Sequence, residues 1–245
     1  MDGPPRLDAD VAVAGVDGCR SGWVVAIAAA GAAPTVRPDR PVAVEVEVVA
    51  SFDAVAALLR EGRVGLVAVD MPIGLSERDP RPCDRAARAL AGPRRASVFP
   101  APLRATVGAS DYGEALARSR AVSGRGLSVQ AFNLLAKITE VERAVRELGQ
   151  ARIVEAFPEL GFAGLSGAAM AHPKRNAAGA SERLAALEPW FAAVRDLARS
   201  RRGAAADDVL DALAVLWIAR RIAAGAAARL GGERDATGLR MEVWY

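Results

Sequence analysis

The stretch "VAVAGVDGCRSGWVVAIA", residues 11–28, contains two apolar runs separated by a short turn with two glycines. The first run, residues 11–16, holds only apolar residues and glycine, which is typical of a strand buried on both faces. The second run, residues 23–30, predicts the next strand, and a hairpin is the simplest connection between them. The only carboxylate of the stretch, Asp17, therefore stands where the first strand ends.

Further strands follow along the chain. Residues 41–49 predict a third strand, and the alternating Glu45 and Glu47 indicate one wet face and a place near a sheet edge. Residues 64–70, "VGLVAVD", repeat the opening feature, because this apolar strand also ends in a carboxylate, Asp70. Residues 152–157, "RIVEAF", predict a short strand with Glu155 at its centre. Helices are predicted over residues 51–60, 111–122, 128–148, 180–199 and 206–229, and a short strand or tail over residues 239–245.

The order of these elements indicates the fold class. Three strands in a meander, followed by strands that helices separate, predict an α/β fold with a mixed five-stranded sheet and helices on both faces. This is the RNase H-like arrangement, with the first strand central and the fourth and fifth parallel beside it. We expect a disordered leader over residues 1–10, one domain over residues 11–245, and within it a helical, arginine-rich insertion after the fourth strand, residues 77–150.

Composition narrows the class of protein. The chain has 245 residues, and its 52% of hydrophobic residues is ample for a core. Its net charge of +3 is weak evidence about partners. We find no signal peptide and no membrane-spanning stretch, and expect a soluble cytoplasmic protein without a membrane partner. Two cysteines are too few for a disulfide framework, and the single histidine, His172, excludes most histidine-based catalysis.

Carboxylates gather at the places where this fold puts its sites. Asp17 and Asp70 would stand at the carboxyl ends of neighbouring parallel strands, with Glu155 on the next strand. In "DDVLDALAVLWIA", residues 207–219, Asp208 and Asp211 are three apart and share a helix face. Divalent cations relieve the repulsion within such a cluster and can activate water for phosphodiester cleavage. Each aspartate also has a structural reading, as a partner of turn amides or as a helix cap.

We therefore predict a Mg²⁺ or Mn²⁺ site with Asp17, Asp70, Asp208 and Asp211 as metal ligands and Glu155 as a further catalytic carboxylate. An arginine side chain can bind a phosphate through two parallel hydrogen bonds. Polar residues of one glycine-containing segment and of one basic loop can orient a substrate. Each of these features also has a purely structural interpretation: the arginines can form a solvated helix face, Ser128 can be an N-cap, and residues 172–179 can be a flexible loop. The predicted substrate-binding residues are Arg20, Arg81, Arg85, Arg88, Ser128, Gln130, Lys137, Lys174 and Arg175.

Six ordered motifs resemble those of the DUF429 family: "GVDGCRSGW" (15–23), "VDMPIGL" (69–75), "RPCDRAAR" (81–88), "SVFPAP" (97–102), "EAFPELGF" (155–162) and "DDVLDALAV" (207–215). The resemblance covers nearly all of the chain from residue 11 and implies an RNase H-like fold and a nuclease activity. The helix motif is also similar to that of RuvC-type resolvases, whose last catalytic carboxylates match Asp208 and Asp211. Asp17 matches their first-strand aspartate, whereas Asp70 stands where they carry glutamate.

The sequence thus predicts a metal-dependent nuclease or phosphodiesterase that acts on a nucleic acid or nucleotide. One alternative is a nucleotide-binding phosphotransferase or ATPase of the actin-like and sugar-kinase type, although we find no second glycine-rich phosphate loop. Another is a catalytically silent module that binds nucleic acid through its arginines. The sequence does not determine the oligomeric state, and a dimer is among the states that it allows.

Overall fold

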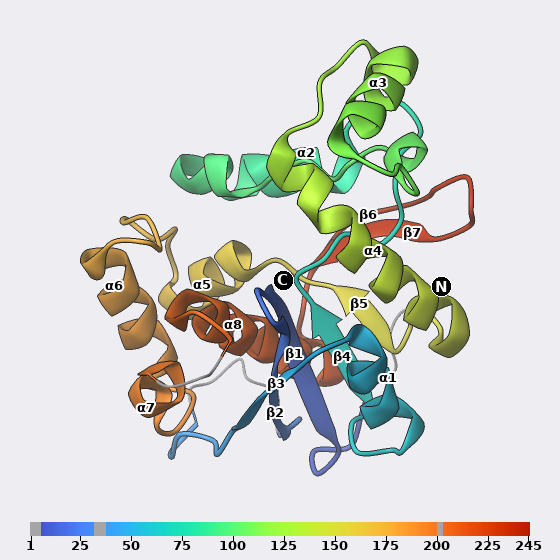
Figure 1. Ribbon diagram of the computed structural model, residues 1–245. Helices are drawn as coiled ribbons and strands as arrows, with labels where there is room; N and C mark the ends of the chain where they lie inside the picture. The colour runs from blue at the N-terminus through green and yellow to red at the C-terminus, as the bar shows by residue number, and fades with distance from the viewer. Residues whose placement is uncertain (1–5, 32–37, 200–202) are drawn as a thin grey trace.

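The computed structural model describes residues 6–31, 38–199 and 203–245, and its central feature is a five-stranded sheet (Figure 1). The strand order is β3-β2-β1-β4-β5, with β1 in the middle. β1 runs antiparallel to β2 and parallel to β4, which is in turn parallel to β5. This is the predicted RNase H-like α/β arrangement. The strands are β1 (Ala12–Cys19), β2 (Gly22–Ala29), β3 (Glu45–Val49), β4 (Leu66–Val69) and β5 (Ile153–Glu155).

The register of the parallel strands brings three acidic residues to one end of the sheet. Val16 of β1 lies opposite Val69 of β4, and Val69 lies opposite Glu155 of β5. Asp17 and Asp70 each follow one residue later on their strands. The carboxyl ends of β1, β4 and β5 therefore meet at one edge, as the sequence predicted.

Helices cover both faces of the sheet (Figure 1). One face packs against a group of helices in the C-terminal half of the chain, and the other packs against the two helices that precede β4 and β5 in sequence. Two more helices and two 3-10 turns lie beyond the carboxyl ends of the strands. The first group is α5 (Pro158–Ser166), α6 (Ala177–Leu187), α7 (Val194–Arg199) and α8 (Ala206–Ala223); the second is α1 (Phe52–Arg60) and α4 (Val129–Leu148); the third is α2 (Pro82–Leu90), η1 (Gly92–Ser97), η2 (Arg104–Thr106) and α3 (Tyr112–Ser123).

Helix α8 lies directly on β1 because Gly15 has no side chain. A Cβ atom at Gly15 would lie 2.1 Å from the backbone nitrogen of Leu216 and 2.4 Å from the carbonyl oxygen of Ala212, far inside van der Waals contact. Glycine lets the two backbones approach this closely. The contact fixes α8 against the strand that carries Asp17.

Side-chain alternation along the strands decides which residues face α8. Val13 in β1 and Leu66 and Ala68 in β4 pack into the core on the α8 side, whereas Val16 and Val69 pack on the α1–α4 side. Successive side chains of a strand point to opposite faces. By this alternation Asp17 and Asp70, two positions after Gly15 and Ala68, lie on the α8 side.

The structure differs from the sequence prediction in the C-terminal region. Helix α8 ends at Ala223, six residues before the predicted end, and Gly225 follows with a φ of 69°. Glycine in this left-handed region is a common helix stop. Residues 224–228, which were assigned to the helix, form a turn and an irregular segment, and Arg229 begins β6 (Arg229–Arg234), which pairs with β7 (Arg240–Trp244) in a second, two-stranded sheet.

The predicted insertion over residues 77–150 is also only partly separate from the sheet. Helix α4 contributes Ile138 and Val141 to the core on one sheet face, so it is a layer of the domain. The predicted leader, residues 1–10, lies outside the described residues up to position 5. Beyond it, the amide of Leu7 donates to the carbonyl of Ala223, and the packed part of the chain begins before Val11. No helix in the described ranges combines the length and apolar character needed to span a membrane.

Candidate active site

Three aspartates from three elements line one cavity of about 500 Å³ at the carboxyl end of the sheet. Asp17 lies within β1, which continues two residues beyond the strand end predicted at Asp17, to Cys19; Asp70 follows β4, and Asp211 lies in the second turn of α8. Asp17 is 8% exposed and Asp211 4% exposed, while Asp70 is partly buried. The structure therefore brings together three of the four predicted metal ligands.

Burial raises the pKa of all three carboxyl groups, and repulsion within the cluster adds to the shift for Asp17 and Asp70. Burial, then the Asp70 and Asp211 charges, raise the pKa of Asp17 well above its usual range. Burial and the charge of Asp211 raise the pKa of Asp70 to about 8. Burial also raises the pKa of Asp211, to about 6, although Lys174 partly offsets the shift. Carboxylates that repel one another in a cavity are a recognised mark of functional sites.

Lys174 supplies a positive charge inside this cluster. It lies in the segment between α5 and α6, and its ammonium forms an ion pair with the buried carboxylate of Asp211. Burial alone would lower the pKa of Lys174, but Asp211, and then Asp17 and Asp70, raise it. Lys174 therefore stays protonated and balances part of the negative charge.

The fourth predicted ligand, Asp208, is placed differently. One of its carboxylate oxygens accepts a hydrogen bond of 2.9 Å from the backbone amide of Ala205, at the start of α8. Asp208 thus has the helix-capping role that was the structural alternative, and it does not line the cavity. Across the ranges that the structure describes, no three His, Cys, Asp or Glu side chains are arranged so that they could hold a metal ion.

Glu155 is part of a buried ion-pair network, in contrast to its predicted catalytic role. Its two oxygens accept from the Arg81 guanidinium at 2.6 and 2.8 Å, and one of them also accepts from the Ile73 amide at 2.7 Å. Arg81 in turn pairs with Asp84. Because Val154 faces α8, Glu155 points to the opposite side of the sheet from Asp17. Both oxygens are therefore occupied.

A carboxylate that the sequence analysis did not select, Glu159, lies on the α8 side. It belongs to α5, is 8% exposed, and its charge contributes to the raised pKa values of Asp70 and Asp211. One oxygen accepts from Arg183 at 2.7 Å, whereas Oε2 is buried without a hydrogen-bond partner. The sequence could have indicated Glu159, because it lies in the motif "EAFPELGF", four residues after Glu155.

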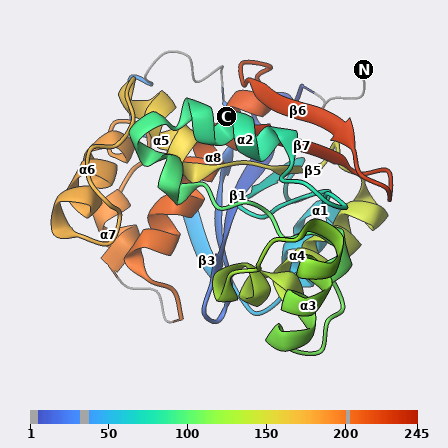
Figure 2. The same ribbon diagram turned by 90° about the horizontal axis from the view of Figure 1, so that it is seen from above.

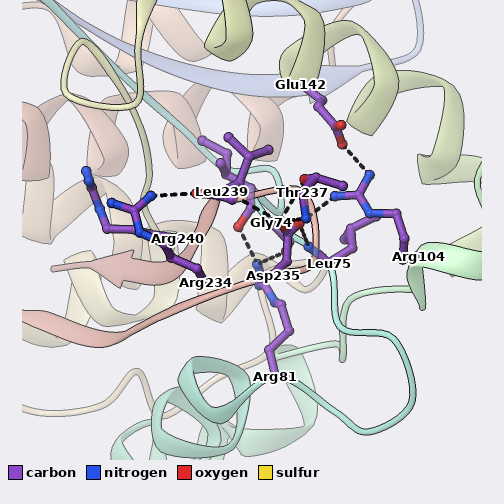
Figure 3. Close-up of polar contacts among 12 residues, drawn as sticks. Gly74, Leu75, Arg81, Arg104, Glu142, Arg234, Asp235, Thr237, Leu239 and Arg240 are labelled. Carbon is purple, nitrogen blue, oxygen red and sulfur yellow. Dashed lines mark hydrogen bonds and ion pairs between the residues drawn. The ribbon is translucent and has the colours of Figure 1, made fainter.

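Two polar anchors hold the segment that follows Asp70. Arg81 donates to the carbonyl oxygens of Ile73 and Gly74, and Asp235 accepts from the amide of Leu75 at 2.9 Å. Figure 3 shows both side chains reaching this segment from different elements. Burial alone would raise the pKa of Asp235, but hydrogen bonds from Thr237, Leu75 and Arg104 lower it to about 2. Asp70 therefore begins a segment that is fixed on two sides.

The predicted substrate-binding residues divide into two groups. Gln130, Lys137, Lys174 and Arg175 line the cavity, together with Arg94. Arg81 lines it too, but it is only 2% exposed and its guanidinium is taken up by Glu155 and Asp84, so the prediction that it binds substrate is wrong. The remaining residues lie off the cavity: Arg20 in the β1–β2 turn, Arg85 and Arg88 bonded to the carbonyls of Pro80 and Val98, and Ser128 as the N-cap of α4.

The comparisons with known proteins bear on family and fold. The sequence matches the profile described as "Protein of unknown function (DUF429)" over residues 15–236. A structure of T. thermophilus RuvC in complex with a Holliday junction substrate is similar, at 15% sequence identity and a TM-score of 0.40, over 88% of this chain and 97% of that chain. A comparison with curated proteins gives no match.

Proposed function

The chain belongs to the DUF429 family, whose function is unknown, so its activity has to be argued from its cavity, and we propose that it hydrolyses phosphodiester bonds with the help of Mg²⁺ or Mn²⁺. The observation that carries the proposal is the meeting of Asp17, Asp70 and Asp211 on one cavity wall with raised pKa values. Nothing in folding requires three carboxylates to be buried together, and each is expensive to bury while charged. A cation bound there would remove that cost.

The donor set agrees with a hard divalent cation in its chemistry. Asp17, Asp70 and Asp211 offer only carboxylate oxygens, which are the ligands that Mg²⁺ and Mn²⁺ prefer. Their arrangement in the structure is not that of a ligand group, and Lys174 is paired with Asp211. We infer that the ammonium of Lys174 holds the place of a cation and leaves Asp211 when one binds.

Within this proposal the side chains have separate tasks. Asp17, Asp70 and Asp211 would hold the ion, which supplies Lewis-acid stabilisation of charge on the phosphate and of an attacking water. Lys174, once released from Asp211, and Lys137 on the neighbouring wall would contact phosphate oxygens. Arg81 and Glu155 act through the backbone that follows Asp70 and are positioning residues.

The proposal is tested by cleavage of labelled single-stranded, duplex, hybrid and branched substrates with Mn²⁺, with Mg²⁺ and with EDTA. Asp17→Asn and Asp211→Asn should each lower the rate at least 100-fold. Asp196→Asn is the matched control, because Asp196 is a helical aspartate with an 81% exposed side chain, and it should leave the rate unchanged. Cleavage that survives in EDTA, or in both cavity variants, would overturn the proposal.

One observation favours a second candidate, a silent nucleic-acid-binding module. The Lys174–Asp211 ion pair neutralises part of the cluster without a metal. In that case nucleic acid binds equally well in EDTA, no substrate is turned over, and Lys174→Met weakens binding. The metal-dependent hydrolase instead predicts turnover, and it predicts that the same variant still binds metal.

A further inference from the structure

We propose that the cavity accepts one unpaired nucleotide unit at a time, either as a free nucleotide or as the unpaired end of a strand, and that it excludes continuous duplex. This inference names the substrate of the proposed phosphodiesterase and rests on that function for the fate of the phosphate. It is carried by the size of the cavity, by the burial of its carboxylates and by the chemistry of its walls.

The cavity has the size of a small-molecule site. Its volume of about 500 Å³ falls within the range of roughly 300 to 1,000 Å³ that is usual for ligand pockets. One nucleotide fits such a space, whereas a double helix needs an open groove along a surface. Asp17 and Asp211 line this space and are almost fully buried, so a phosphate bound within it lies next to their carboxylates.

A roof closes the cavity on the side where a duplex would approach. We use "roof" for residues 82–99, which comprise α2, Ala91, η1 and the two residues after η1. Ala87, Pro93 and Phe99 of the roof line the cavity. Figure 2, seen from above, shows α2 lying between α5 and the β6–β7 hairpin, across the end of the sheet.

The roof is packed at both ends. On one side, Ala87 of α2 and Ala91, which follows the helix, form a hydrophobic cluster with Leu160 of α5. On the other side, Cys83 packs with Met241 and Val243 of β7. These contacts hold α2 over the carboxylates. A phosphate within a regular duplex would have to displace this packing, whereas a single unit extruded from the stack would not.

The walls match the parts of one nucleotide. Phe99 is a cavity-lining aromatic residue that is 54% exposed, and an exposed ring can stack on a base. Pro93 and Leu134 add apolar surface beside it. Lys137 of α4 and Arg175 of the α5–α6 segment add positive charge to the lining, although the Lys137 ammonium also donates to the carbonyl oxygen of Gly22 and lies over the Trp23 ring. Apolar surface, an exposed aromatic ring and basic side chains in one cavity fit a base and its phosphate.

The experiment measures binding without turnover, using the Asp17→Asn protein in EDTA. The probes are thymidine 5′-monophosphate, inorganic phosphate, a blunt duplex, and the same duplex with a single-stranded overhang. Ala96→Trp fills the cavity from an exposed roof position that lines it, and Ala89→Trp adds the same ring at an exposed position of α2 that does not line it. Circular dichroism and melting curves of both variants establish that they are folded.

We expect the overhang duplex to bind at least tenfold more tightly than the blunt duplex, and the nucleotide at least tenfold more tightly than inorganic phosphate. Ala96→Trp should weaken binding of the overhang duplex and the nucleotide at least tenfold, and Ala89→Trp should change neither. If only the overhang duplex binds, the unit is a strand end; if the nucleotide binds as well, free nucleotides are also substrates.

Equal binding of blunt and overhang duplex, nucleotide binding no tighter than phosphate binding, an unaffected Ala96→Trp protein, or no binding of any probe would each overturn the inference. Failure of the proposed function gives a different pattern. In that case the expected binding differences are present, but the unsubstituted protein does not turn over any substrate with Mg²⁺ or Mn²⁺. Conversely, metal-dependent cleavage of blunt duplex that Ala96→Trp does not affect would remove the substrate assignment alone.

Discussion

Replacing Asp70 by asparagine is expected to stabilise the protein above neutral pH while it removes the proposed activity. Burial and the charge of Asp211 raise the pKa of Asp70 from 3.8 to about 8. Each pKa unit corresponds to about 1.4 kcal/mol, so the whole shift sets an upper limit of roughly 6 kcal/mol. Asp70 is only partly buried and shares its shift with its neighbours, and we therefore expect about 2–4 kcal/mol.

The sign of the pH dependence follows from the direction of the shift. Because the folded-state pKa of Asp70 is raised, its contribution to stability is fully present below the unfolded pKa near 4, and it is lost as the pH rises toward about 8. The asparagine variant has no such loss. Its advantage over the unsubstituted protein should be largest above pH 8 and should shrink toward pH 4.

The assay is thermal unfolding in EDTA from pH 4 to pH 9, followed by circular dichroism. For a chain of this length, 2–4 kcal/mol corresponds to a rise in Tm of roughly 4–16 °C at pH 9. Asp79→Asn, at an exposed position away from the cavity, should change Tm by less than about 2 °C. Added Mn²⁺ should stabilise the unsubstituted protein and not the Asp70→Asn variant. An Asp70→Asn protein that is less stable at pH 9 would refute the reasoning.

Three further predictions concern the ion pairs and the helix contact. Arg81→Met leaves two buried carboxylates without their partner and should lower the free energy of unfolding by about 3–5 kcal/mol in urea; a loss below about 1 kcal/mol would contradict a structural role. Gly15→Ala should yield insoluble protein, because the new Cβ would overlap α8. Gly126→Ala, where the nearest contact of the new Cβ is at 3.8 Å, should express normally. Soluble, native-like Gly15→Ala protein would disprove the close approach of α8 to β1. Lys174→Met should bind Mn²⁺ at least tenfold more tightly by calorimetry, and Arg175→Met should not; unchanged affinity would mean that the lysine does not compete with a cation.

The fold was predictable because its determinants are local and repeat along the sequence. Apolar strands that end in carboxylates, and amphipathic helices between them, specified a mixed sheet with β1 at its centre, and the structure confirms that arrangement. The end of α8 was misjudged because its alanine-rich sequence continues past Ala223, where Gly225 turns the chain. The layer role of α4 depends on what its apolar face contacts, which spacing alone does not reveal.

The site was predictable only in part, because a side chain's direction depends on strand register. Side-chain alternation along the strands points Asp17 and Asp70 toward α8. Glu155 points to the opposite face of the sheet, where it pairs with Arg81. Glu155 and Glu159 both line the cavity, but Glu155 is taken up by Arg81, whereas Glu159 comes from a neighbouring helix, α5, on the α8 side. A carboxylate at the end of a strand was therefore a sufficient signal for proximity, and not for direction.

The contact between Gly15 and α8 assigns the positioning of the carboxylates and the selection of ligands to different parts of the chain. It makes the positions of Asp17 and Asp211 a property of the hydrophobic core, since neither can shift without moving a strand against a helix. The roof and the segment that carries Lys174 contribute no strand to the central sheet. The residues that hold these aspartates in place therefore differ from the exposed residues that line the rest of the cavity. Laboratory evolution could vary exposed roof residues such as Ala96 and Phe99 to change which molecules bind, without altering the contact that positions Asp17 and Asp211.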